Sequence, residues 1–86
     1  MNKTIVIKHR DTYLYTFWHV PNASSINDLI YLSSSRKELF FSTEDATKYI
    51  NKIKKFINSV KNDSIKNELS LIVNELTIKE FSYEKI

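Results

Sequence analysis

Hydrophobic and polar positions follow a helical period in the middle of the chain. Over residues 42–61, apolar side chains recur three and four positions apart, which is typical of a helix with one buried stripe. These apolar residues are Ala46, Tyr49, Ile50, Ile53, Phe56, Ile57 and Val60. The positions off the stripe are mostly Lys and Asn. The pattern therefore predicts a helix that packs one face and presents a positive surface on the other, with Ser42 or Thr43 as N-cap and Asp45 at capping-box spacing.

A second helical pattern follows the Asn62-Asp63 break, and it begins at Asp63 or Ser64. Its inward positions are Ile65, Leu69, Ile72, Val73 and Leu76. Residues 77–83 then predict a closing strand. The three-residue spacing of Ile78 and Phe81 suggests a bulge in that strand near Lys79-Glu80.

The N-terminal part alternates with the period of β-strands and predicts a hairpin over residues 3–9 and 12–20. A two-residue loop at Arg10-Asp11 would pair His9 with Thr12, Ile7 with Leu14 and Ile5 with Thr16. One face of this hairpin is then formed by Ile5, Ile7, Leu14 and Trp18. The other face is formed by Val6, Lys8, Tyr13, Tyr15 and Phe17. The strand ends at Pro21, because proline cannot donate to a ladder.

Residues 25–35 admit two structures. Ser25 and Asp28 have the spacing of a cap for a short helix, whereas residues 29–32 are equally suited to a strand, which we favour. Residues 38–41 predict a short strand that leads into the main helix.

Together these elements predict an α+β domain, a small and mostly antiparallel sheet with two helices on one face. With 86 residues, the chain should form a single domain over residues 1–86. The predicted core comprises Ile5, Ile7, Leu14, Trp18, Phe40, Ala46, Ile50, Ile53, Ile57, Ile65, Leu69, Ile72 and Ile78.

Composition removes several classes of function. The chain has no Gly, which excludes glycine-rich phosphate loops of the Rossmann and P-loop kinds. It has no Cys, so disulfides, thiolate metal sites and Cys nucleophiles are excluded. No apolar run approaches the length of a membrane span or a signal sequence, and we expect a cytoplasmic protein that does not contact membranes.

Charge is the feature that points to a ligand. The net charge is +3. Residues 46–66 contain six lysines and a single acid, Asp63. Lys48, Lys52 and Lys55 share the outer face of the main helix, with Lys54 and Lys61 on its flank. Arg10, Arg36 and Lys37 lie in predicted turns and extend the basic surface. This set predicts phosphate contacts to RNA or DNA, although a solvated helix face would have the same composition.

Aromatic residues supply a second candidate surface. Tyr13, Tyr15 and Phe17 alternate along one strand and could stack nucleic-acid bases if that sheet face is open. They could equally be a packed face or the interface of a homodimer, because exposed aromatic clusters usually find a partner.

Catalytic, metal and cofactor sites are not predicted. His9 and His19 lie at opposite ends of the second strand, so they do not converge on a metal. His9 and Asp11 flank the turn, and we interpret them as a chance surface pair and not an acid–base pair. The adjacent carboxylates of Glu44 and Asp45 are explained by their favourable interaction with the helix dipole. We therefore expect a protein without enzymatic activity.

Residues 38–46, Glu-Leu-Phe-Phe-Ser-Thr-Glu-Asp-Ala, are followed by Tyr49-Ile50. Over residues 36–57 this stretch resembles an element of small phage early proteins, in which a hairpin and short strand precede an F-x-T-x-x-x-A-x-x-Y/F-I helix start. This chain has one residue fewer than that pattern between Thr43 and Ala46. Several such proteins of T-even-type phages blunt host defences, one by inhibiting an endoribonuclease toxin through RNA binding. The resemblance implies a non-enzymatic role in the host cytoplasm.

Two functional hypotheses follow. The first is a small regulator that binds RNA or another polyanion through the lysine face, with Tyr13 and Tyr15 stacking bases. The second is a protein-binding inhibitor that occludes a host nuclease, toxin or polymerase through Tyr13, Tyr15 and Phe17.

Overall fold

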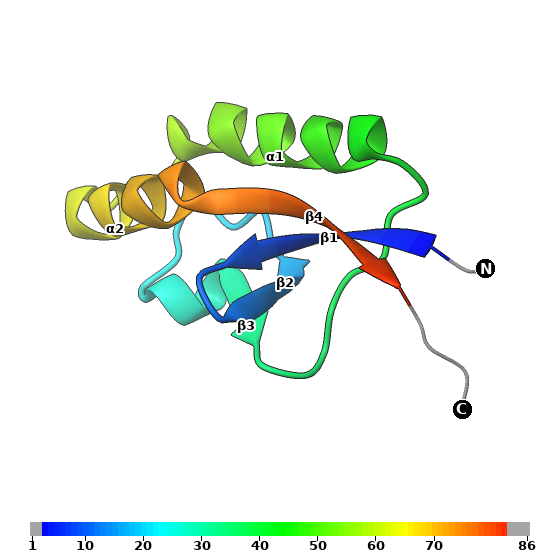
Figure 1. Cartoon of the computed structure of the whole chain (residues 1–86). Helices are drawn as coiled ribbons and strands as arrows, with labels where there is room; N and C mark the ends of the chain where they lie inside the picture. Colours follow the sequence, from blue (N-terminus) through cyan, green and yellow to red (C-terminus); the bar gives the residue numbers. More distant parts are fainter. Residues whose placement is uncertain (1–2, 83–86) are drawn as a thin grey trace.

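The computed structural model describes residues 3–82, which form an antiparallel four-stranded sheet covered on one face by two α-helices (Figure 1). The elements in chain order are β1 Lys3–His9, β2 Thr12–Phe17, the short 3-10 helix η1 Ile26–Asp28, β3 Ile30–Ser33, α1 Thr43–Ile57, α2 Asp63–Asn74 and β4 Leu76–Ser82. The strand order is β3-β2-β1-β4. The predicted α+β fold is confirmed.

Helix α1 begins where its cap residue predicts. The Ser42 side-chain oxygen accepts a hydrogen bond from the Asp45 backbone N–H at 3.1 Å. The helix ends at Ile57, four residues before the predicted end, because the Ser59 and Val60 N–H groups bond three positions back to Phe56 and Ile57. This tightened turn buries Val60.

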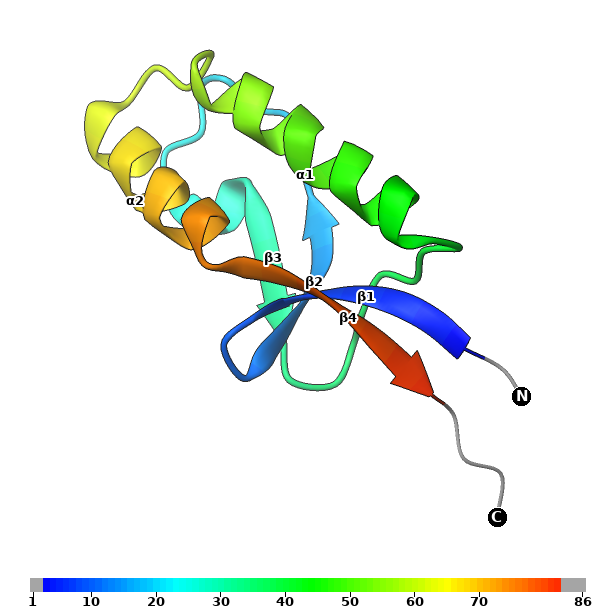
Figure 2. The same cartoon turned by 45° about the horizontal axis from the view of Figure 1, so that its top comes forward.

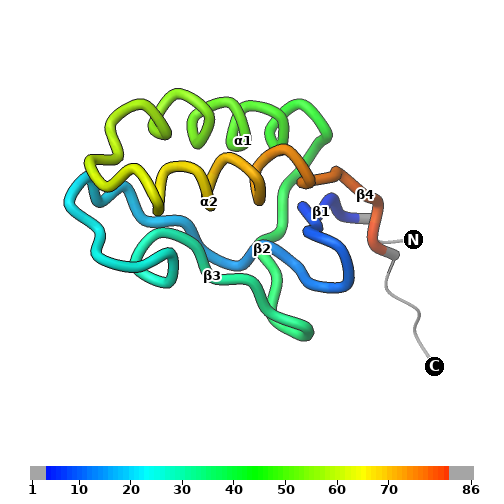
Figure 3. Tube along the Cα trace, turned by 90° about the vertical axis from the view of Figure 1, so that its left-hand side faces the viewer, coloured from blue at the N-terminus to red at the C-terminus, as the bar shows by residue number. Residues whose placement is uncertain are grey.

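Helix α2 is capped by Asn62, whose side-chain oxygen accepts from the Ile65 N–H at 3.1 Å. Its buried residues Ile65, Leu69 and Val73 join those of α1 in one core cluster with the sheet. The two helices lie side by side, and α2 also contacts η1 (Figure 3).

Strand β4 pairs with β1 along its whole length, from Lys3 opposite Ser82 to His9 opposite Leu76. The register is unbroken, so the bulge predicted near Lys79-Glu80 is wrong. Ile78 packs against the core and Phe81 lies on the opposite face, which is ordinary alternation. Tyr83, part of the predicted strand, lies outside the described residues.

The bulge is instead in β2, between Leu14 and Thr16. The hairpin starts as predicted, with His9 opposite Thr12, but its ladder with β1 includes only one further pair, Lys8 with Tyr13. The predicted Ile7–Leu14 and Ile5–Thr16 pairs do not form, because β2 diverges from β1 at a steep angle (Figure 2).

Residues 38–40 cross between the diverging strands. The Glu38 N–H donates to the Leu14 carbonyl at 3.0 Å, and Phe40 and Ile5 exchange two backbone hydrogen bonds of 2.9 and 3.1 Å. The strand predicted over residues 38–41 is thus reduced to a single bridge at Phe40. This crossing satisfies backbone groups that the hairpin leaves unpaired.

Both structures considered for residues 25–35 occur, one after the other. η1 is held by the Asp28 carboxylate, which accepts from the Ser24 and Ser25 N–H groups and from the Ser24 hydroxyl. Strand β3 then pairs with β2.

The core forms between the helices and the inner sheet face, largely as predicted. Its largest fully buried members are Ile7, Leu14, Leu29, Ile53 and Leu69. Trp18 is the clear error: its side chain is 44% exposed. Beyond the bulge, Phe17 takes the inward position that plain alternation gives to Trp18.

Candidate nucleic-acid interface

The face of the sheet away from the helices gathers aromatic and cationic side chains. The Tyr13 side chain points to this face because that of its neighbour Leu14 points into the core. Lys8 lies opposite Tyr13 in the ladder. We define the outer sheet face as Lys8, Tyr13, Tyr15, Tyr31, Arg36, Lys37 and Phe81. They come from all four strands and from the loop that follows β3.

One half of the outer sheet face is centred on Lys37. Its ammonium lies 4.6 Å from the centre of the Tyr13 ring and 4.8 Å from that of Phe81, while its Nζ donates to the Ser35 carbonyl at 2.8 Å. The two rings meet edge to face at 6.3 Å, and the Lys8 ammonium is 5.3 Å from Tyr13. Val6, only 1% exposed, belongs to this face by alternation. Lys37 therefore holds its loop over the rings of Tyr13 and Phe81.

The other half is centred on Tyr15. Its ring meets that of Tyr31 edge to face at 5.6 Å, and the Arg36 guanidinium lies 5.8 Å from it. Tyr31 is 41% exposed, and Arg36 is exposed. The Arg36 N–H donates to the Ser33 hydroxyl at 3.0 Å, which orients the loop. This half offers an exposed Tyr31 ring and a half-buried Tyr15 ring beside an exposed planar cation.

Phe17, the third predicted member of the aromatic surface, does not belong to it. The bulge in β2 turns this ring inward, where it is 7% exposed and meets Phe56 of α1 edge to face at 5.8 Å. An extra residue in a strand reverses the facing of everything that follows. The structure thus places Tyr13 and Tyr15 on the outer sheet face, as the alternation predicts, and Phe17 in the core.

The lysine face of α1 is a separate surface. Lys48, Lys52 and Lys55 are exposed and, with Asn51, line a shallow hollow. Lys54 is exposed in the last turn, whereas Lys61 lies beyond the helix end. Because α1 packs Ala46, Ile50 and Ile53 against the inner sheet face, its lysines point to the side opposite Tyr13 and Tyr15. The two surfaces that the sequence suggested would act together are therefore divided by the core.

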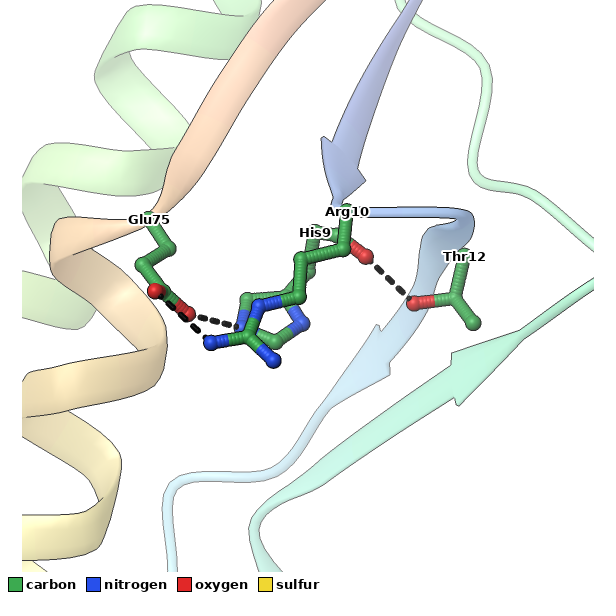
Figure 4. Close-up of polar contacts among 4 residues, drawn as sticks. All are labelled: His9, Arg10, Thr12 and Glu75. Carbon is green, nitrogen blue, oxygen red and sulfur yellow. Dashed lines mark hydrogen bonds and ion pairs between the residues drawn. The ribbon is translucent and has the colours of Figure 1, made fainter.

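Arg10 is engaged elsewhere. It stands at the hairpin tip with a positive φ of 56°, and its Nη2 contacts the Glu75 Oε2 at 3.0 Å. The His9 Nε2 contacts the other carboxylate oxygen at 2.9 Å, and the Thr12 hydroxyl donates to the His9 carbonyl (Figure 4). Glu75, not Asp11, is thus the partner of His9. The charge of Arg10 is compensated, which makes it a weaker candidate for phosphate binding than Arg36.

This contact predicts a pH dependence. The hydrogen bond from Arg10 is the largest factor that holds the pKa of Glu75 below its ordinary value of 4.5. A carboxylate with a lowered folded-state pKa stabilises the fold above its unfolded pKa and loses that contribution as the pH falls. We expect the urea midpoint of the wild type to fall more between pH 6 and 3 than that of Glu75→Gln. Glu68→Gln, at an exposed position of α2, is the control and is expected to retain the wild-type dependence.

The sequence reasoning missed Tyr31, Phe81 and Glu75. Tyr31 and Phe81 were visible as aromatic residues in strands, but only the sheet order shows that they flank Tyr15 and Tyr13. No signal in the sequence links Glu75 to a turn 65 positions away.

Among the described residues, no group of three or more His, Cys, Asp or Glu side chains is placed to hold a metal ion. Residues 3–82 also contain no helix that is long and apolar enough to cross a membrane. Comparison of the chain with protein-family models, with curated proteins and with solved structures found no match.

Proposed function

We propose that this protein is a non-enzymatic regulator that binds single-stranded RNA, and that the outer sheet face is its binding site. The observation that carries the proposal is the placement of three cations, Lys8, Arg36 and Lys37, over tyrosine and phenylalanine rings on one sheet face. Single strands are bound by surfaces of this kind, on which bases stack and phosphates meet adjacent cations.

Roles within the face are proposed from the partners of each ring, since Tyr13 already contacts Lys8, Lys37 and Phe81. Tyr15 and Tyr31 are the rings proposed to stack bases, and Arg36 beside them is proposed to contact a phosphate. Lys37 already has two rings and a carbonyl as partners, so it contributes positive potential more than a direct contact. The lysines of α1 act at a distance and favour the approach of a polyanion.

The first test is the affinity for a labelled single-stranded RNA across a salt series, measured by fluorescence anisotropy. Two or three phosphate contacts would give a slope of log K against log salt of about −1.4 to −2.1. Arg36→Glu is expected to remove about 0.7 from this slope. Lys52→Glu, an equal change of charge on α1, is expected to leave it nearly unaltered. Duplex RNA is expected to bind less well, because its bases are already stacked.

Absence of binding at low salt would contradict the proposal and favour the other hypothesis, a protein-binding inhibitor that uses the outer sheet face. That hypothesis loses Phe17, which lies in the core, but retains Tyr13 and Tyr15 on the outer sheet face. Inhibition of a host defence or toxin rests on the resemblance of residues 36–57 to phage early proteins and stays a prediction.

A further inference from the structure

The segment before α1 exposes large apolar side chains. Phe41 is fully exposed and Leu39 is about half exposed, and both line a small apolar hollow with Thr4 and Phe40. We name Leu39 and Phe41 the Phe41 tip. The neighbouring Phe40 is half-buried against Tyr49, so the backbone here is anchored while the tip faces solvent.

Acidic residues flank the Phe41 tip along the chain. Residues 38–47 contain Glu38, Glu44 and Asp45, all exposed, and no Lys or Arg. The charge of Glu38, second to burial, raises the pKa of Tyr49, which places this carboxylate beside the first turns of α1. The tip is thus an apolar point with an acidic rim on a chain whose net charge is +3.

The opposite end of α1 has the complementary character. Pro21, Asn58, Ser59, Val60 and Lys61 line a surface hollow, which we name the Lys61 hollow. The Lys61 N–H donates to the Pro21 carbonyl at 3.0 Å and ties its two sides together. Lys54 and Lys55, in the last turn of α1, add two more exposed cations at this end. Figure 1 shows the two ends of α1 at opposite sides of the molecule.

We propose that copies of this chain associate head to tail, with the Phe41 tip of one copy seated in the Lys61 hollow of the next. Charge selects this arrangement, because contact between two tips would bring Glu38, Glu44 and Asp45 of both copies together. A tip-to-hollow contact instead pairs acids with lysines and covers the Phe41 ring with the exposed Pro21. Such a contact is heterologous, so it extends into chains unless it closes into a ring.

The contact is small by the standards of stable assemblies, so the association is weak and depends on concentration. Sedimentation velocity from micromolar to millimolar protein is expected to show a rising mean mass, and added salt is expected to reduce it. Phe41→Ser is expected to weaken the association by about tenfold or more, because a buried aromatic anchor dominates small interfaces. Leu71→Ser is the matched control, since this residue is 68% exposed on α2 and lines neither the Lys61 hollow nor the hollow at the Phe41 tip.

A mixing experiment separates this geometry from a symmetric dimer. Phe41→Ser retains the hollow, and Lys61→Glu retains the tip, so each variant alone is expected to stay monomeric. Their mixture is expected to form heterodimers that stop at two copies. A wild-type protein that stays monomeric at millimolar concentration would overturn the proposal, and so would a mixture that does not associate. Neither result bears on RNA binding, which is measured at low protein concentration.

Discussion

Replacement of Phe17 by alanine is expected to lower the free energy of unfolding by about 3–5 kcal/mol. The ring is buried in the core cluster and meets both Phe56 and His19 edge to face. Its removal leaves a cavity between β2 and α1, next to Phe56. For a chain of this length the total stability is about 4–13 kcal/mol, so the loss is a large share of it.

Urea unfolding followed by circular dichroism measures this effect. Phe17→Leu is the second variant, because a smaller loss keeps the protein folded and the transition measurable. Tyr31→Ala, at an exposed ring of the neighbouring strand, is the control and is expected to cost less than half as much. Equal losses for Phe17→Ala and Tyr31→Ala would contradict the burial of Phe17 in the core.

The double variant Tyr15→Ala/Tyr31→Ala is expected to bind single-stranded RNA at least tenfold more weakly than the wild type. Each base stacked on an aromatic ring contributes about 1–3 kcal/mol, and 1.4 kcal/mol corresponds to a factor of ten. Phosphate contacts are untouched, so the slope of log K against log salt is expected to stay the same. A lower affinity with an unchanged slope would show that the lost contribution is base stacking and not phosphate contact.

The control for this variant is Phe41→Ala, which removes an exposed ring that lies outside the outer sheet face. Its RNA affinity is expected to match that of the wild type. Wild-type affinity in Tyr15→Ala/Tyr31→Ala, with weaker binding in Lys52→Glu, would move the site to the lysine face of α1. Circular dichroism of each variant confirms that the fold is retained.

Local signals were sufficient for the starts of the helices and for the turn. The Ser42 cap with Asp45, the Asn62-Asp63 break and the two-residue loop at Arg10-Asp11 each depend on neighbours within four positions. The structure places each of them where the sequence predicts, because hydrogen bonds this close in the chain need no tertiary context.

Local spacing could not predict which face of the sheet a strand residue points to. Leu14 and Phe17 are three positions apart, and so are Ile78 and Phe81. In β2 a bulge turns both residues inward, whereas in β4 an unbroken register places the two on opposite faces. The same spacing thus has two outcomes, and the crossing of residues 38–40 between β1 and β2 accompanies the difference.

The candidate site depends on the same long-range crossing. Arg36 and Lys37 were expected to extend the basic surface, and the loop that leads into the crossing carries them onto the rings of Tyr15 and Tyr13. The lysines of α1 were correctly predicted as an exposed face, since helical periodicity is a local property. Their separation from the tyrosines follows only from the packing of α1 on the inner sheet face.

The pairing of β1 with β4 has a consequence for synthesis on the ribosome. β1 shares two residue pairs with β2 but seven with β4. His9 and Glu75 are 66 positions apart, so at about 5–20 residues per second the partner strand follows roughly 3–13 s later. During that interval the nascent chain carries Ile5, Val6 and Ile7 with one edge unpaired. A product that stalls before β4 therefore exposes an aggregation-prone strand, and the sheet is completed only as the last strand emerges.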